Sequence, residues 1–298
     1  MRPTRDTAAG QAYLDLQNRA RREGRGTQQL LTLYVVECWL ARLSRSRYAH
    51  QFILKGGMLL AAFDARGPTA DADALARGMA SDEITVVGRV AEIAAYDADD
   101  GVEFLTGTVT ARRIRDEARY GGLRITMDAR IATANVKFRL DVNFGDPVTP
   151  GPQRIELPSL RTDAPSIRML GYPIETVLAE KIATAITLGP ANTRVRDFAD
   201  VYTLTGRHDL TYAVMREALL TTAAFRATAL TPLSSTLDNL IELRVSAYRA
   251  YRSSLGPDGD NLPDDFADVV AVVAAFADPL IDTTRDHISW QAAHRRWR

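Results

Sequence analysis

Two aspartates one residue apart, Asp71 and Asp73, are the residues of this 298-residue chain that point most directly to chemistry. On a strand, alternate side chains face the same way, so both carboxylates would face one Mg²⁺ site. Such an ion neutralises a triphosphate and stabilises the attacking and leaving oxygens of a transfer reaction. A solvated strand edge produces the same D-x-D pattern, and the pair alone does not decide between the two interpretations.

A third carboxylate, Asp141, strengthens the first interpretation. It belongs to the segment 134–144, ANVKFRLDVNF, in which apolar and polar residues alternate as in a strand with one buried face. Asp141 lies on the polar face, and we assign it with Asp71 and Asp73 to the metal site. A half-solvated antiparallel strand explains the same alternation without any site.

A phosphate-binding turn is predicted at Lys55, Gly56 and Gly57. These residues join a short apolar strand to a helix. Glycine lets a phosphate approach backbone N–H groups, and the N-terminus of a helix favours an anion. The Walker A pattern is absent, so this is not a P-loop. The alternative is a tight turn with an exposed lysine.

Two charges occur where helical spacing predicts apolar side chains. Lys181 falls in the middle of an apolar stripe on the helix predicted from Pro173 to Leu188, and Asp197 lies at the border of the stripe on the next helix. One interpretation is a purely structural ion pair between them. In the other, Lys181 contacts a triphosphate, and Asp197 orients that lysine or helps to activate the acceptor hydroxyl.

The elements that must position these residues form two groups. Hydrophobic periodicity predicts helices first, then a strand-rich section, then a wholly helical remainder that includes a helix at 287–296. We therefore predict an α+β domain at residues 1–170 and an α-helical domain at residues 171–298 that completes the active site. The segment 145–153, GDPVTPGPQ, is predicted to be a loop.

Composition limits the partners and the compartment. The chain has 37 basic and 37 acidic residues, so a nucleic-acid partner needs a local basic patch. No apolar run reaches the ~18 residues that span a bilayer, and the N-terminus lacks the apolar segment of a secretory signal. The single cysteine, Cys38, is predicted to be a buried structural thiol. We expect a cytoplasmic protein with no membrane partner.

Five segments together resemble a known family. They are LKGGMLL at 54–60, PTADAD at 68–73, LDV at 140–142, LAEKIATAI at 178–186 and RVRDFADVYTL at 194–204. In this order they resemble the AbiEii/AbiGii family of nucleotidyltransferase-like toxins, which includes the mycobacterial MenT toxins. The resemblance implies a DNA-polymerase-β-like nucleotidyltransferase fold with a mixed sheet, and a cognate antitoxin protein as partner.

The resemblance also implies residue roles. Asp71 and Asp73 would be the metal-binding pair, and Lys181 and Asp197 the essential residues of the helical motifs. We add Thr69 and Arg194, which lie in matching segments, to the predicted nucleotide-binding residues.

With what the resemblance implies, the predicted function is that of an Mg²⁺-dependent toxin that transfers a nucleotide from a nucleoside triphosphate to the 3′ acceptor end of tRNA, blocking aminoacylation and translation. Two alternatives remain open. One is a nucleotidyltransferase that modifies a protein or a small molecule. The other is a non-catalytic module of a defence system that binds a nucleotide or an antitoxin.

Overall fold

A computed structural model describes residues 3–65, 71–114, 121–237, 239–282 and 287–298. The chain divides into two compact units. The first unit comprises residues 1–145 and 153–171, and the second comprises residues 146–152 and 172–298. The loop 146–152 groups with the second unit because the backbone N–H of Thr149 donates to the Thr176 hydroxyl, which in turn donates to the Thr149 carbonyl.

The first unit is built on a mixed seven-stranded sheet in the order β3-β4-β5-β2-β1-β7-β6. The strands are β1 (Phe52–Lys55), β2 (Ala72–Ala76), β3 (Val102–Ile114), β4 (Gly122–Ile131), β5 (Ala134–Phe144), β6 (Gln153–Leu157) and β7 (Ile167–Gly171). β2 pairs with β5, and β1 with β7, in parallel; the other neighbours are antiparallel. This agrees with the predicted α+β class and mixed sheet.

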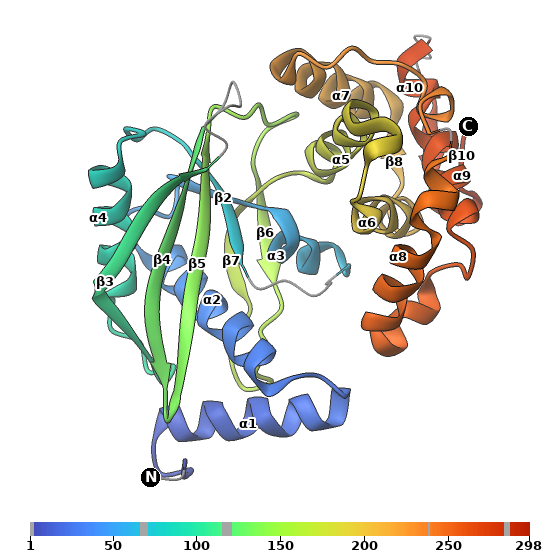
Figure 1. Ribbon diagram of the computed structural model, residues 1–298. Helices are drawn as coiled ribbons and strands as arrows, with labels where there is room; N and C mark the ends of the chain where they lie inside the picture. The colour runs from blue at the N-terminus through green and yellow to red at the C-terminus, as the bar shows by residue number, and fades with distance from the viewer. Residues whose placement is uncertain (1–2, 66–70, 115–120, 238, 283–286) are drawn as a thin grey trace. The chain divides into compact units, whose positions relative to one another are not determined.

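One face of this sheet is covered by helix α2 (Thr27–Arg45), as Figure 1 shows. Trp39 of α2 is fully buried, with its ring centroid 5.3 Å from that of Phe138 on β5 and 5.9 Å from that of Phe52 on β1. The buried Glu37 carboxylate of α2 accepts hydrogen bonds from the Leu160 backbone N–H and the Ser159 hydroxyl. α2 therefore fixes several strands at once and leaves the opposite face of β5 polar.

Four further helical segments belong to the first unit. They are α1 (Ala8–Glu23), α3 (Gly56–Leu59), the 3₁₀ turn η1 (Leu60–Phe63) and α4 (Glu83–Ala94). α4 begins at Asp82, whose carboxylate accepts a hydrogen bond from the Thr85 N–H at 2.8 Å, so Asp82 is its N-cap. α3 starts directly after β1, at the glycines of the predicted phosphate turn.

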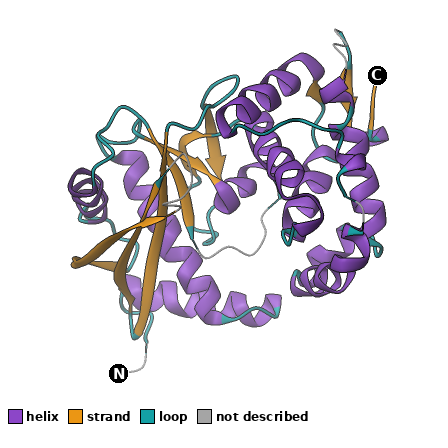
Figure 2. Ribbon diagram, turned by 45° about the horizontal axis from the view of Figure 1, so that its top comes forward, coloured by secondary structure: helices purple, strands orange, loops and turns teal. Residues whose placement is uncertain are grey.

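The second unit is mainly helical (Figure 2, purple). Its helices are α5 (Ile174–Leu188), α6 (Val195–Thr205), α7 (Tyr212–Arg226), α8 (Leu240–Ser254), α9 (Phe266–Ala277) and α10 (Pro279–Asp282), with 3₁₀ turns η2 (Gly189–Ala191), η3 (Leu233–Ser235), η4 (Gly256–Asn261) and η5 (Ala292–His294). A small sheet adds β8 (Leu210–Thr211), β9 (Ser289–Gln291) and β10 (Arg296–Trp297) in the order β10-β9-β8. Within the described residues, no helix is both long and apolar enough to cross a membrane.

Two local predictions were wrong. The segment predicted as a helix at 287–296 instead contributes β9, η5 and the start of β10. Trp290 and Trp297 are seven residues apart, which suits two helical turns, but they pair across the two strands and pack with Phe276. The edge strand β6 was missed because it follows a segment rich in proline and glycine.

The buried thiol gives a first testable prediction. Cys38 is 4% exposed, and burial, with the nearby Asp100 carboxylate, raises its pKa well above the ordinary value. We expect the native thiol to react with a maleimide at least about 100-fold more slowly than the thiol of the denatured chain at about pH 8. Mass spectrometry of labelled protein, with and without urea, measures the ratio. Equal rates in the two states would contradict the buried position.

Candidate active site

The sheet aligns four charged residues in one row. Lys55, the last residue of β1, is the register partner of Asp73 on β2, and Asp73 is in turn the partner of Asp141 on β5. Asp141 is the partner of Arg124 on β4. Register partners on neighbouring strands project to the same face of a sheet, so these side chains share the face opposite α2.

The predicted phosphate turn lies directly against Asp73. Gly56 has φ +67°, and a Cβ placed on it would come within 2.1 Å of Asp73 Oδ2. Only glycine fits both the backbone angle and the space. Lys55 is 6% exposed, so the alternative of a surface lysine in a tight turn is wrong. The sequence therefore brings a lysine, a glycine turn and an aspartate together at the end of β1.

Asp71 precedes the first residue of β2 and lies on the same face as Asp73. Its carboxylate forms an ion pair with Arg139 of β5, with 3.6 Å between Asp71 Oδ1 and Arg139 Nη1. Ala72, between the two aspartates, is fully buried on the opposite face. The predicted shared face of Asp71 and Asp73 thus follows from the burial of the small residue between them.

Asp141 is engaged by an arginine that the sequence analysis did not select. Both of its carboxylate oxygens accept hydrogen bonds from Arg124, at 2.8 Å from Nε and 2.7 Å from Nη2. These bonds and the charge of Asp141 raise the pKa of Arg124, and Asp71 and Asp73 contribute in the same direction. The guanidinium therefore lies in the field of all three carboxylates.

The oxygen donors of this face suit a hard divalent ion such as Mg²⁺. Asp71 and Asp73 are the residues that would hold it. Across the described ranges, no three Asp, Glu, His or Cys side chains gather as a three-ligand site requires. Asp141 holds Arg124 in this arrangement, so its predicted role as a third metal ligand stays a prediction. Thr69 lies outside the described residues.

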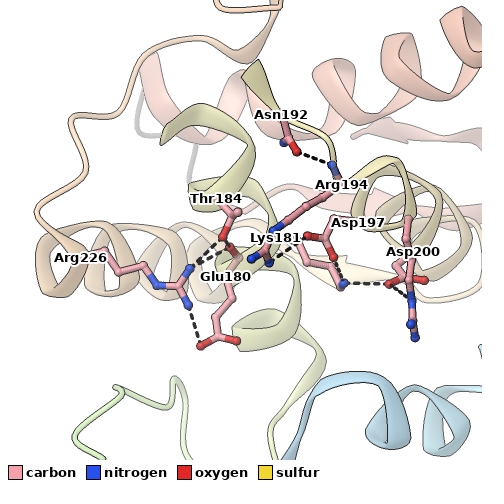
Figure 3. A network of polar contacts seen from close by, with 9 residues as sticks. Glu180, Lys181, Thr184, Asn192, Arg194, Asp197, Asp200 and Arg226 are labelled. Atoms are coloured by element: carbon pink, nitrogen blue, oxygen red, sulfur yellow. Dashed lines mark hydrogen bonds and ion pairs between the residues drawn. The ribbon is translucent and has the colours of Figure 1, made fainter. Parts of the chain in front are cut away.

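A second cluster lies within the helical unit (Figure 3). Lys181 Nζ donates to Asp197 Oδ1 at 2.5 Å and to Asp200 Oδ2 at 2.8 Å. Burial alone would lower the pKa of Lys181, but the two carboxylates outweigh it and raise the pKa. The predicted pairing of Lys181 with Asp197 is therefore present, and Lys181 stays a cation between two anions.

Asp200 was missed by the sequence analysis, although a signal for it existed. It lies three residues after Asp197 on α6, so the two carboxylates share one helix face. Arg194, at the start of α6, approaches Asp197 with 3.8 Å between Nη1 and Oδ2, and Arg196 approaches Asp200 at 3.7 Å. Beside them, Arg226 pairs with Glu180 at 2.9 Å and donates to the Thr184 hydroxyl.

An acidic pair beside a glycine turn, on an α+β fold, suits an enzyme that transfers a phosphorus-containing group. The sequence profile of the family described as "Nucleotidyl transferase AbiEii toxin, Type IV TA system" matches residues 39–272. Because this match covers most of the chain, the protein belongs to the AbiEii family of nucleotidyltransferase toxins of type IV toxin–antitoxin systems.

A solved structure shows the same kind of fold. The chain is similar to MenT4, a nucleotidyltransferase toxin from Mycobacterium tuberculosis, at 15% identity and a TM-score of 0.50, over 89% of this chain and 98% of that one. It is also similar to JHP933 from Helicobacter pylori at 14% identity and a TM-score of 0.49, over 86% and 92% of the two chains. A search of curated protein sequences gave no match.

The contact between Gly56 and Asp73 generates a second prediction. Gly56→Ala should destabilise the protein more than Gly78→Ala does. Gly78 is a matched control because it has φ +63°, but a Cβ added to it would meet nothing within 4 Å. Backbone strain alone costs about 1–2 kcal/mol, and the clash with Asp73 adds to it in Gly56→Ala. Urea denaturation measures both variants. Equal losses would show that Asp73 gives way at no cost.

The helical cluster generates a third prediction. Lys181→Met leaves two carboxylates without their common cation and should lower the free energy of unfolding by about 3 kcal/mol. Lys137→Met is the control, because its partner Asp128 is exposed and such pairs contribute about 1 kcal/mol or less. Combining Lys181→Met with Asp200→Asn should recover part of the loss in urea denaturation. An equal effect at both lysines would contradict the cluster's role in stability.

Proposed function

We propose that this toxin transfers a nucleotide from a nucleoside triphosphate to the 3′ acceptor end of tRNA, which blocks aminoacylation and translation. The observation that carries the proposal is the row of Lys55, Asp73, Asp141 and Arg124 across four strands, with the Gly56 turn against Asp73. This row supplies a phosphate-binding turn at Gly56, an acidic pair formed by Asp73 together with Asp71, and a cation, Arg124, beyond Asp141. The family supplies the class of reaction.

In this reaction the terminal hydroxyl oxygen of the acceptor forms a bond to the α-phosphorus of the triphosphate. The bond from that phosphorus to the oxygen bridging the α- and β-phosphates breaks, and pyrophosphate leaves. The hydroxyl proton passes to a carboxylate of the acidic face. Mg²⁺, held by Asp71 and Asp73, would offset the charge that develops on the phosphate oxygens.

Within this proposal, each unit has a role. Lys55, Gly56 and Gly57 of the first unit bind the triphosphate, and the buried Lys55 ammonium attracts its charge. Lys181 and Asp197 stay our predicted catalytic residues of the helical unit, with Arg194 beside them as a nucleotide-binding residue. We further propose a cognate antitoxin protein that restrains the activity, and a DNA-polymerase-β-like arrangement of the catalytic sheet.

The acidic pair gives the direct test. Incubation with labelled nucleoside triphosphates, Mg²⁺ and total tRNA should label tRNA, and Asp71→Ala should reduce the labelling by about 100-fold or more. Thermal unfolding should change little, because Asp71 takes part in a half-exposed ion pair. Asp128→Ala is the control, since Asp128 lies on the same sheet face and pairs with Lys137.

The destination of the label separates the proposal from its alternatives. Label on protein or on a small molecule would keep the transfer chemistry and replace the acceptor. Binding of a triphosphate without pyrophosphate release, together with toxicity that survives Asp71→Ala, would indicate a non-catalytic binding module. Labelling that Asp128→Ala reduces as strongly as Asp71→Ala would remove Asp71 from the proposed metal site.

A further inference from the structure

Arginines extend the row of charges beyond Asp141, away from the glycine turn. Arg124 on β4 is the register partner of Arg112 on β3, so both project to the face that carries Asp73. One register step along this face, the hydroxyls of Thr110 and Thr126 lie 2.7 Å apart, which confirms that the same face continues onto β3. Arg139 of β5 joins the two arginines on this face.

The two sides of Asp73 differ in charge and in shape. On the β1 side lie Lys55 and the Gly56 turn, which suit the triphosphate. On the β5 side lie Asp141 and then the arginines. In a transfer reaction the attacking and leaving oxygens lie roughly in line, on opposite sides of the phosphorus. If pyrophosphate leaves toward the glycine turn, the acceptor hydroxyl must approach from the β5 side.

We propose that the arginine face, formed by Arg112, Arg124 and Arg139, binds the sugar–phosphate backbone of the nucleic-acid acceptor next to its terminal hydroxyl. This inference rests on the proposed function. The arginine face is a partner surface for a polyanion, and it supplies the local basic patch that a chain with no net charge needs to hold tRNA.

The pairing of Arg124 with Asp141 is compatible with this role. A guanidinium has five N–H donors, and the pairing uses one on Nε and one on Nη2. The Arg124 side chain is 36% exposed, so its outer edge can meet a phosphate while Asp141 fixes its plane. Asp141 is then a positioning residue for the cation nearest the reacting hydroxyl.

The position of Arg112 distinguishes a polymer from a small acceptor. Arg112 is exposed and lies three strands from Asp73, which is about 14 Å at ~4.8 Å per strand. A small acceptor bound at Asp73 would not reach a cation at this distance. A nucleic-acid strand whose 3′ end lies at Asp73 carries further phosphates outward over β4 and β3.

The test uses the full-length toxin and labelled tRNA. Arg112→Gln should raise the KM for tRNA about five- to tenfold and leave the KM for the triphosphate unchanged. The slope of log affinity against log salt concentration, from fluorescence anisotropy of tRNA binding, should fall by about 0.7–0.9. Arg112→Lys should keep most of the wild-type KM for tRNA and most of the wild-type salt slope, because a phosphate contact needs the charge.

Arg130→Gln is the matched control. Arg130 lies on β4, on the same face as Arg124 but at the far end of the strand, paired with Glu103 at 4.0 Å. Arg130→Gln should leave tRNA binding unchanged. If Arg112→Gln also left tRNA binding unchanged, the inference would be overturned. The inference would also be overturned if Arg112→Gln raised only the KM for the triphosphate. The same holds if Arg112→Gln labelled tRNA as the wild type does and lost only its inhibition by an antitoxin, because the arginine face would then bind the antitoxin. A wild-type toxin that labels no RNA would instead refute the proposed function itself.

Discussion

The register of β2 between β1 and β5 is the constraint on which the acidic face depends. It places Asp73 beside Lys55 on one side and beside Asp141 on the other. A slip of β2 by one residue would turn Asp73 toward the core beneath α2 and bring the buried Ala72 or Ala74 to the charged face. The packing of Trp39 against two strands therefore stabilises the site from the opposite face of the sheet.

In the helical unit, charged side chains lie on helix faces that are otherwise apolar, and they are stabilised there by one another. Lys181 on α5 is compensated by two carboxylates of α6, whose charges and hydrogen bonds raise its pKa and favour the charged form. Removing Lys181 leaves Asp197 and Asp200 close together with only the more distant Arg194 and Arg196 as cations, which is costly for partly buried carboxylates. The same arrangement that fixes the packing of α5 against α6 thus also fixes the position of a cation, so stability and reactivity must be measured separately at these residues.

Much of the acidic face was predictable because strand alternation is a strong signal. The alternation of segment 134–144 and the spacing of two aspartates one residue apart led to Asp141 and to Asp71 and Asp73. The partner Arg124 was also within reach, since a tight turn between Ile131 and Ala134 sets the register of β4 with β5. Periodicity failed at Trp290 and Trp297, where a seven-residue spacing fits a helix and long-range packing selects two strands instead.

The arginines beside the carboxylates have a consequence for how the protein is made. Acidic groups that face one another repel, and a fold that relies on a bound ion to relieve this repulsion waits for that ion before it can form. Here Arg124 neutralises Asp141 and Arg139 approaches Asp71 within the chain itself. Arginines of the chain itself therefore offset the charge of two of the three carboxylates, and this compensation does not depend on the proposed divalent ion.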